Sequence, residues 1–130
     1  MMEKRKVILA LGSNYNQVDN MVKARHMLIG FLSKSRFSSL KWTDPINIIS
    51  DQFLNCLLIG ETERSLQSLQ SILKCIEEKC GDTSSLRQKN IICMDIDILL
   101  LGDKRMHKLD WQRPYIQQLM NELSTDTPSI

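Results

Sequence analysis

The sequence predicts an α+β fold of the ferredoxin-like, split βαβ type, in which two helices cover one face of an antiparallel sheet. Three observations support this prediction. Short apolar runs occur at four places, apolar residues recur at helical spacing in two long segments between them, and the order is strand, helix, strand, strand, helix, strand. A short helix follows near the C-terminal end. In this arrangement we expect the ligand site on the open face, opposite the two long helices.

The first part of the chain supplies a strand, a helix and an edge strand. Residues 7–11 form a continuous apolar run that ends at a Gly-Ser-Asn turn, as is typical of a central strand. Over residues 16–34 apolar side chains recur every three or four positions, which predicts an amphipathic helix. Residues 37–43 alternate loosely before an Asp-Pro step, so we expect an edge strand followed by a turn.

The middle of the chain predicts a second strand and helix pair. Residues 45–51 form an irregular loop with three isoleucines, as expected of a segment that covers a ligand or a partner. Residues 52–60 predict a buried strand, and residues 66–80 predict a helix that ends at a glycine. The polar segment 82–90 is expected to be a mobile functional loop, and residues 115–123 have helical spacing.

The strand expected over residues 91–101 carries two carboxylates in an apolar run. Asp95 and Asp97 share one face of an extended strand, about 7 Å apart along it. The other face is expected to hold Met94, Ile96, Ile98 and Leu100. Because like charges repel, the pair indicates a bound cation, and Mg²⁺ prefers such carboxylate oxygens. The alternative is that both aspartates are simply solvated on an open sheet.

Length and composition indicate one domain of ordinary globular type. With 130 residues, 42% hydrophobic and 25% charged, we expect a single domain over residues 1–124 and a frayed tail over 125–130. A net charge of +2 gives no general field for nucleic acid, and the apolar run at 7–11 is too short for a signal segment or a membrane span. The four cysteines show no zinc-binding spacing. We therefore expect a cytoplasmic monomer without nucleic-acid or membrane partners.

Five separated motifs occur in order between residues 7 and 102. They are Leu11-Gly12-Ser13-Asn14, Thr43-x-Pro45, Phe53-Leu54-Asn55, Ile76-Glu77 with Gly81, and Met94-Asp95-Ile96-Asp97-Ile98. In order and approximate spacing this set resembles the 6-hydroxymethyl-7,8-dihydropterin pyrophosphokinases of folate biosynthesis. These enzymes transfer the β,γ-diphosphate of ATP to the hydroxymethyl oxygen of the pterin, and the resemblance implies the same activity here, with pterin and ATP as small-molecule partners.

The resemblance also implies roles for individual residues. Asp95 and Asp97 would hold two Mg²⁺ ions that bridge the phosphates of ATP, and Arg87 would close over those phosphates as a third catalytic residue. The residues implied in pterin binding are Gly12, Thr43, Pro45, Ile46, Phe53, Asn55 and Tyr115. Those implied in ATP binding are Glu77, Arg87, Lys89, Ile98 and Arg113.

Several alternatives stay open at this point. The segment before the aspartates offers only Arg87 and Lys89, where the family usually carries several arginines and a tryptophan, so a weakened enzyme or a pterin- and nucleotide-binding protein is a second hypothesis. A third is a ferredoxin-like interaction module with solvated aspartates. Asn55 could read the ligand or bond to neighbouring backbone. Tyr115 could stack on a pterin or belong to the core.

Overall fold

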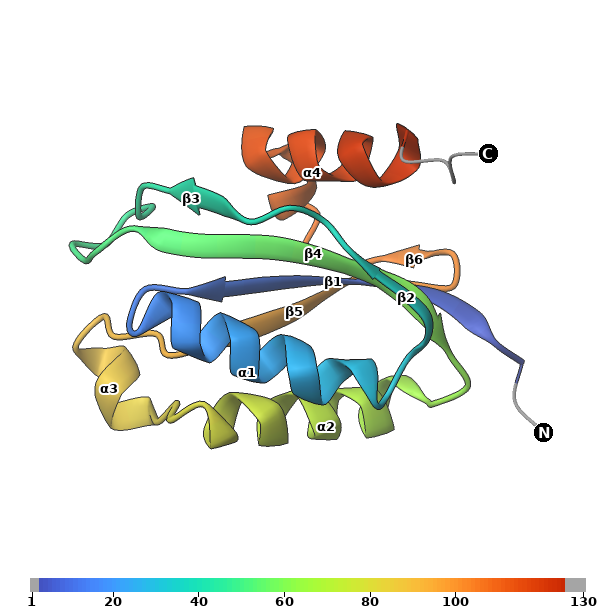
Figure 1. Cartoon of the computed structure of the whole chain (residues 1–130), viewed down its shortest axis with the longest axis horizontal. Coiled ribbons are helices and arrows are strands. Elements are labelled where there is room, and N and C mark those ends of the chain that lie inside the picture. Colours follow the sequence, from blue (N-terminus) through green and yellow to red (C-terminus); the bar gives the residue numbers. More distant parts are fainter. Residues whose placement is uncertain (1–2, 126–130) are drawn as a thin grey trace.

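The computed structural model describes residues 3–125, whose strands form one antiparallel sheet of six strands (Figure 1). The strands are β1 (Arg5–Ser13), β2 (Ser33–Phe37), β3 (Lys41–Thr43), β4 (Phe53–Thr62), β5 (Asp95–Leu101) and β6 (Lys104–Arg105). Along the sheet the order is β2, β4, β1, β5 and β6, and β3 also pairs with β4. The long strands β1 and β4 therefore form the centre of the sheet, and β5 lies beside β1.

The helices lie on both faces of this sheet. They are α1 (Gln17–Ile29), α2 (Leu66–Lys79), the short α3 (Ser84–Gln88), a 3-10 turn η1 (Asp110–Gln112) and α4 (Pro114–Thr125). Figure 1 shows α1 and α2 side by side below the sheet and α4 above it. Among the described residues, no helix combines the length and the apolar character needed to cross a bilayer. The ferredoxin-like strand order and the pair of helices on one face are confirmed.

The expectation of an uncovered second face is wrong in part. The larger core cluster packs between the sheet and helices α1 and α2, whereas a second cluster joins the other face to α4. The buried members of that second cluster are Ile8, Leu57, Leu99, Ile116, Leu119 and Leu123. Apolar side chains on both faces of β1 and β4 need cover, so α4 packs over the centre of the second face. The face stays open towards the end of the sheet where Asp95 lies.

A β-bulge at Leu99 corrects the assignment of one side chain on β5. Leu9 pairs with Ile98 and Ile8 pairs with Leu100, so Leu99 has no partner in β1. An extra residue in one strand reverses the alternation beyond it. Leu100 consequently packs towards the α4 cluster, on the face of the aspartates, and its predicted position beside Ile96 is wrong.

Predicted boundaries are also wrong at three places. The strand predicted over residues 91–101 begins at Asp95, and Ile92 N instead donates a hydrogen bond to the Asn14 side chain. The helix predicted over residues 16–34 ends at Ile29, and the later apolar signal comes from Leu32, which packs into the core from a turn. The single edge strand predicted over 37–43 is two strands, β2 and β3. At Ser38 the hydroxyl accepts a hydrogen bond from Leu57 N, which interrupts the regular backbone ladder with β4.

The segment 82–90, expected as a loop, contains α3. Thr83 begins this helix because its hydroxyl accepts a hydrogen bond from Leu86 N at 3.1 Å. The remaining predicted elements, including the helix that ends at Gly81 and the C-terminal helix, are present. Of the tail expected over residues 125–130, Thr125 belongs to α4 and the rest lies outside the described residues; the single-domain boundary stays a prediction.

Candidate active site

The site begins as a row of residues across three neighbouring strands. Gly12 on β1 pairs with Asn55 on β4 and, on its other side, with Asp95 on β5. Two residues earlier on β1, on the same face of the sheet, Ala10 pairs with Asp97. Because Gly12 and Ala10 have little or no side chain, the sheet between Asn55 and the two aspartates is a shallow floor. Strands lie about 4.8 Å apart, so Asn55 and Asp95 stand about 10 Å from each other across this floor.

A cavity of about 290 Å³, here called the Asn55 cavity, lies over this floor. Six of the seven residues implied in pterin binding line it: Gly12, Thr43, Ile46, Phe53, Asn55 and Tyr115. Pro45 is not among the lining residues, although Asp44 and Ile46 on either side of it are. Arg113, implied in ATP binding, lines this cavity instead. The fold therefore brings six of these seven residues together around one cavity, from β1, β3, β4, α4 and the loop after β3.

Asn55 presents one side of its amide to this cavity. Its Nδ2 donates hydrogen bonds to Lys41 O at 3.0 Å and to Thr43 Oγ1 at 2.8 Å, and the residue is 5% exposed. Among the described residues, no group donates a hydrogen bond to its Oδ1. A Cβ placed at Gly12 would stand 3.1 Å from that oxygen. The protein thus fixes Nδ2 and leaves Oδ1 as an oriented acceptor, so bonding to neighbouring backbone is confirmed and ligand reading by Asn55 stays a prediction.

Tyr115 likewise contributes to two parts of the structure. It lies in the first turn of α4, packs against the α4 cluster and also lines the Asn55 cavity. Burial raises the pKa of its phenol. A core tyrosine and a cavity wall are therefore compatible at this position.

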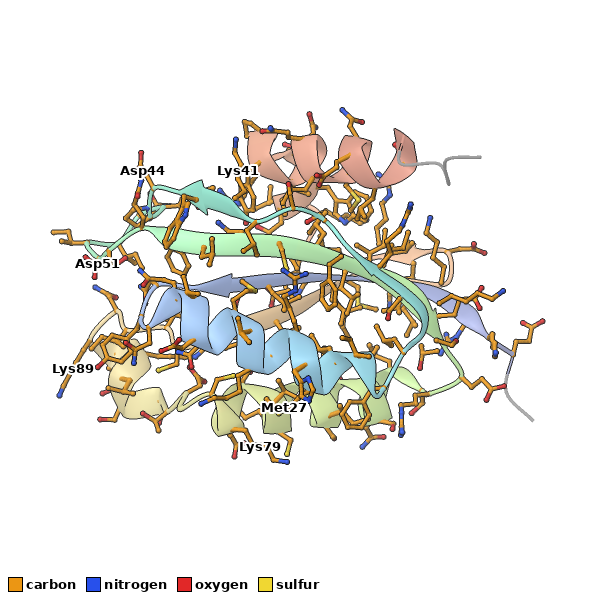
Figure 2. The ribbon with its side chains drawn as sticks, in the orientation of Figure 1. Met27, Lys41, Asp44, Asp51, Lys79 and Lys89 are labelled. Carbon is orange, nitrogen blue, oxygen red and sulfur yellow. The ribbon has the colours of Figure 1, made fainter. Side chains whose placement is uncertain are left out.

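A second cavity, of about 370 Å³, lies on the other side of the aspartates and is here called the Arg87 cavity. Among the residues implied in catalysis and ATP binding, it is lined by Glu77, Arg87, Asp95, Asp97 and Ile98. Lys89 does not line it: Figure 2 shows this side chain at the outer end of α3, pointing away from the sheet. The structure therefore separates Lys89, like Arg113, from the other three residues of the predicted ATP site.

Arg87 is held in place by several carboxylates. Its Nε donates to both oxygens of Asp82, at 2.8 and 2.9 Å, and its Nη2 donates to Asp95 Oδ1 at 3.2 Å. The same Nη2 donates to Met94 O at 3.1 Å and lies 3.9 Å from Glu77 Oε2. These anions together raise the pKa of the guanidinium, against the effect of its burial. Arg87 is thus a fixed positive charge beside Asp95.

Glu77 is tied to the strand of the aspartates. Its Oε2 accepts a hydrogen bond of 2.7 Å from Ile96 N, and burial raises the pKa of the carboxyl. Since β6 pairs with β5 only at Leu100 and Leu101, this part of β5 has no strand on its outer side among the described residues. Glu77 therefore satisfies an edge donor and connects α2 to β5, while its side chain still lines the Arg87 cavity.

Asp95 and Asp97 line both cavities. Their side chains are 39% and 32% exposed. Burial, followed by the negative charge of Asp95, raises the pKa of Asp97 to about 8. A buried carboxyl beside a second carboxylate holds its proton more tightly than a solvated one. Two half-exposed carboxylates that repel each other are a suitable oxygen donor set for Mg²⁺, which completes its shell with water and phosphate oxygens.

Two functional candidates are missed by the reasoning from the sequence. His107 Nε2 lies 3.8 Å from Asp97 Oδ1, and single ligating atoms of Asp97, His107 and Asp110 lie within 4.8 Å of one another. Asp110 also accepts a hydrogen bond from Arg113 Nε at 2.9 Å. The pattern His107-x-x-Asp110-x-x-Arg113 after the aspartate strand is the signal that could have indicated them.

Comparisons with known proteins show which family the chain resembles. Residues 8–125 match the family described as 7,8-dihydro-6-hydroxymethylpterin-pyrophosphokinase (HPPK). The chain is also similar to the mitochondrial folate synthesis bifunctional protein of Pisum sativum, with 30% identity over 136 residues, or 95% of this chain and 26% of the relative. It therefore spans about a quarter of the length of that relative. With the match over nearly all its described residues, the chain belongs to the 7,8-dihydro-6-hydroxymethylpterin-pyrophosphokinase family.

Proposed function

We propose that this protein transfers the β,γ-diphosphate of ATP to the hydroxymethyl group of 6-hydroxymethyl-7,8-dihydropterin, with two Mg²⁺ ions held by Asp95 and Asp97. Family membership supports the reaction class. The observation that carries the assignment of residues is that these two aspartates line both the Asn55 cavity and the Arg87 cavity. A transfer between two substrates needs such a shared wall, because the reacting atoms must meet there.

The proposal assigns a substrate to each cavity. The Asn55 cavity takes the pterin, whose ring donors match the free Oδ1 of Asn55, and Phe53 and Tyr115 supply aromatic walls. The Arg87 cavity takes the phosphates of ATP, where Arg87, Lys74 and His107 are the cationic or protonatable lining residues. Bound Mg²⁺ neutralises phosphate charge, and the protein positions the two substrates; this is the kind of catalysis that phosphoryl transfer requires.

The reaction can be tested directly. The purified chain is incubated with ATP, Mg²⁺ and the dihydropterin, and AMP and the pterin diphosphate are separated by chromatography and quantified. We expect equal amounts of both products, and none from the double variant Asp95→Asn/Asp97→Asn. Asp103→Asn is the matched control, because Asp103 is an exposed carboxylate on the turn after β5 that lines neither cavity. Absence of both products at enzyme concentrations equal to substrate would overturn the proposed activity.

A second candidate is a protein that binds pterin and nucleotide without transfer. The observation in its favour is that the charge of Arg87 is already offset by Asp82 and Asp95, which leaves little net positive charge for phosphates in the Arg87 cavity. Calorimetry that detects pterin and Mg²⁺-ATP binding, combined with absent turnover in the assay above, would favour this candidate. Turnover would exclude it. The cytoplasmic location and the monomeric state stay predictions, to be tested by cell fractionation and by analytical ultracentrifugation.

A further inference from the structure

A large hollow in the described part of the structure lies outside both substrate cavities. It measures about 970 Å³ and is formed under the C-terminal half of α4 by β1, β2, β4, β5, β6 and η1. In Figure 1 this is the region where α4 passes over β6 and β2. None of its lining residues also lines the Asn55 cavity or the Arg87 cavity. We call it the basic cavity, because lysine and arginine side chains are among its lining residues.

Four cationic residues from separate segments line the basic cavity: Lys6, Arg36, Arg105 and Lys108. Arg36 donates a hydrogen bond to Leu123 O at 2.5 Å, at the end of α4, which leaves Lys6, Arg105 and Lys108 as the cations considered for a ligand. Lys6 and Lys108 form no ion pair with any residue that the structure describes. Aspartate and glutamate are absent from the described lining. Since the whole chain carries a net charge of only +2, this concentration of positive charge is local.

The wall of the basic cavity is built around a fixed indole. Trp111 Nε1 donates hydrogen bonds to Leu99 O at 3.1 Å and to Met106 O at 3.0 Å. The guanidinium of Arg105 lies 4.2 Å from the centre of the indole ring, so this cation is held by stacking. Ile8, Ile59 and Leu100 form the apolar floor. The cationic groups therefore surround a defined hollow, which distinguishes it from a flat basic surface.

We propose that the basic cavity binds a small molecule that carries an oligophosphate group. Exposed cations gathered around one hollow whose lining holds no carboxylate repel one another, and a multivalent anion offsets that repulsion. Arginine and lysine are the side chains that most often hold phosphate, the first through its planar fork and the second as a point charge. The volume falls within the range of small-ligand sites, and the concave shape under α4 favours a small molecule over nucleic acid.

The two tryptophans of the chain allow a site-specific test. Trp42 lies on β3, so Trp42→Phe leaves Trp111 in the basic cavity as the sole tryptophan of the sequence. This variant is titrated with inorganic tripolyphosphate in EDTA at low salt, while Trp111 fluorescence and the heat of binding are recorded. No metal, pterin or ATP is present, so the result is independent of the proposed activity. We expect a saturable fluorescence change and one binding event.

Charge removal identifies the residues responsible. Lys6→Gln/Lys108→Gln on the same background is expected to weaken tripolyphosphate binding by roughly tenfold or more. Lys23→Gln/Lys79→Gln, which removes two exposed lysines from α1 and α2 and leaves the same net charge, is expected to change affinity by less than about twofold. Figure 2 shows Lys79 on the far side of the molecule from α4.

A second arm separates two sources of the phosphate group. ADP that binds more tightly than tripolyphosphate, with a larger change in Trp111 fluorescence, indicates a nucleotide; equal or weaker binding indicates a ligand recognised by its phosphates alone. Both results support the proposal. It is overturned if tripolyphosphate causes no saturable change in Trp111 fluorescence. It is also overturned if the Lys6→Gln/Lys108→Gln and Lys23→Gln/Lys79→Gln variants lose affinity for tripolyphosphate equally, because a diffuse surface charge then accounts for the binding.

Discussion

The guanidinium of Arg87 donates a hydrogen bond to Asp95 Oδ1 at 3.2 Å, while Asp82 holds the Nε edge of the same group. A cation from α3 is thus placed beside the first of the two aspartates without any bound ligand. Asp82 belongs to the segment just after α2, and Arg87 lies one helical turn beyond Thr83, which begins α3. The short helix that replaces the expected loop is therefore what positions this charge.

Arg87→Gln is expected to reduce the proposed reaction selectively. Loss of a charge-assisted contact to phosphate should lower kcat/KM for ATP by roughly ten- to a hundredfold, and pterin affinity should change little because Arg87 does not line the Asn55 cavity. AMP formation measured against ATP concentration tests this. Lys89→Gln is the matched control, since Lys89 lies outside both cavities. Equal losses in the two variants would show that a general basic field, and not the placed guanidinium, is responsible.

Gly12→Ala is expected to weaken pterin binding. A Cβ at this position would stand 3.1 Å from Asn55 Oδ1 and 3.7 Å from the Phe53 ring, so it would displace the acceptor assigned to the pterin. A lost or misplaced hydrogen bond should reduce pterin affinity by about ten- to a hundredfold. Isothermal calorimetry with the pterin and, separately, with Mg²⁺-ATP measures both substrates.

Gly30→Ala provides the control for this prediction. Gly30 has a φ of −74°, and a Cβ there would meet its nearest neighbour at an ordinary 3.6 Å. Its affinity for both substrates should equal that of the unaltered protein. A Gly12→Ala protein that binds pterin normally would contradict the placement of the pterin over Gly12.

Asp97→Asn is expected to stabilise the metal-free protein at high pH. Burial and the neighbouring charges of Asp95, Asp110 and Glu77 raise the pKa of Asp97 from 3.8 to about 8. A carboxyl whose pKa is higher in the folded state stabilises it below the unfolded pKa, and this contribution is lost as pH rises through the folded pKa. Thermal unfolding in EDTA at pH 5 and pH 8 should therefore show a larger gain in Tm for the variant at pH 8.

The same measurement with Mg²⁺ adds a second comparison. The metal should raise the Tm of the unaltered protein and have a smaller effect on Asp97→Asn, because ligands that bind the folded state stabilise it. Asp103→Asn should follow the unaltered protein throughout. A gain in Tm for Asp97→Asn that is the same at both pH values would show that Asp97 is not protonated in the metal-free fold.

Leu119→Ala tests whether α4 is an integral layer of the fold. Leu119 is 2% exposed and packs with Ile8 and Leu57 on the second face of the sheet. Truncation of a buried leucine should lower the free energy of unfolding by about 2 to 5 kcal/mol. Gln118→Ala, on the exposed side of the same helix, should change it by less than about 0.5 kcal/mol. Urea unfolding followed by circular dichroism gives both values, and equal effects would mean that α4 is only loosely attached.

Much of the site could be predicted from local pattern because it rests on strands. Alternation along β5 places Asp95 and Asp97 on one face, and the predicted position of Asn55 in a buried strand is confirmed. Residues on irregular segments could not be placed this way. His107 and Asp110 reach the aspartates only through the turns between β6 and α4, where His107 has a positive φ, and no periodicity describes such a path.

By itself, the sequence determined the main strand and helix order and the shared face of the two aspartates. These features follow from the period of each element, which depends on near neighbours in the chain. Tertiary structure alone decided that α4 covers part of the second face, that a bulge at Leu99 turns Leu100 towards it, and that two cavities meet at Asp95 and Asp97. Those outcomes depend on packing between segments distant in sequence, where the burial of apolar surface outweighs local preference.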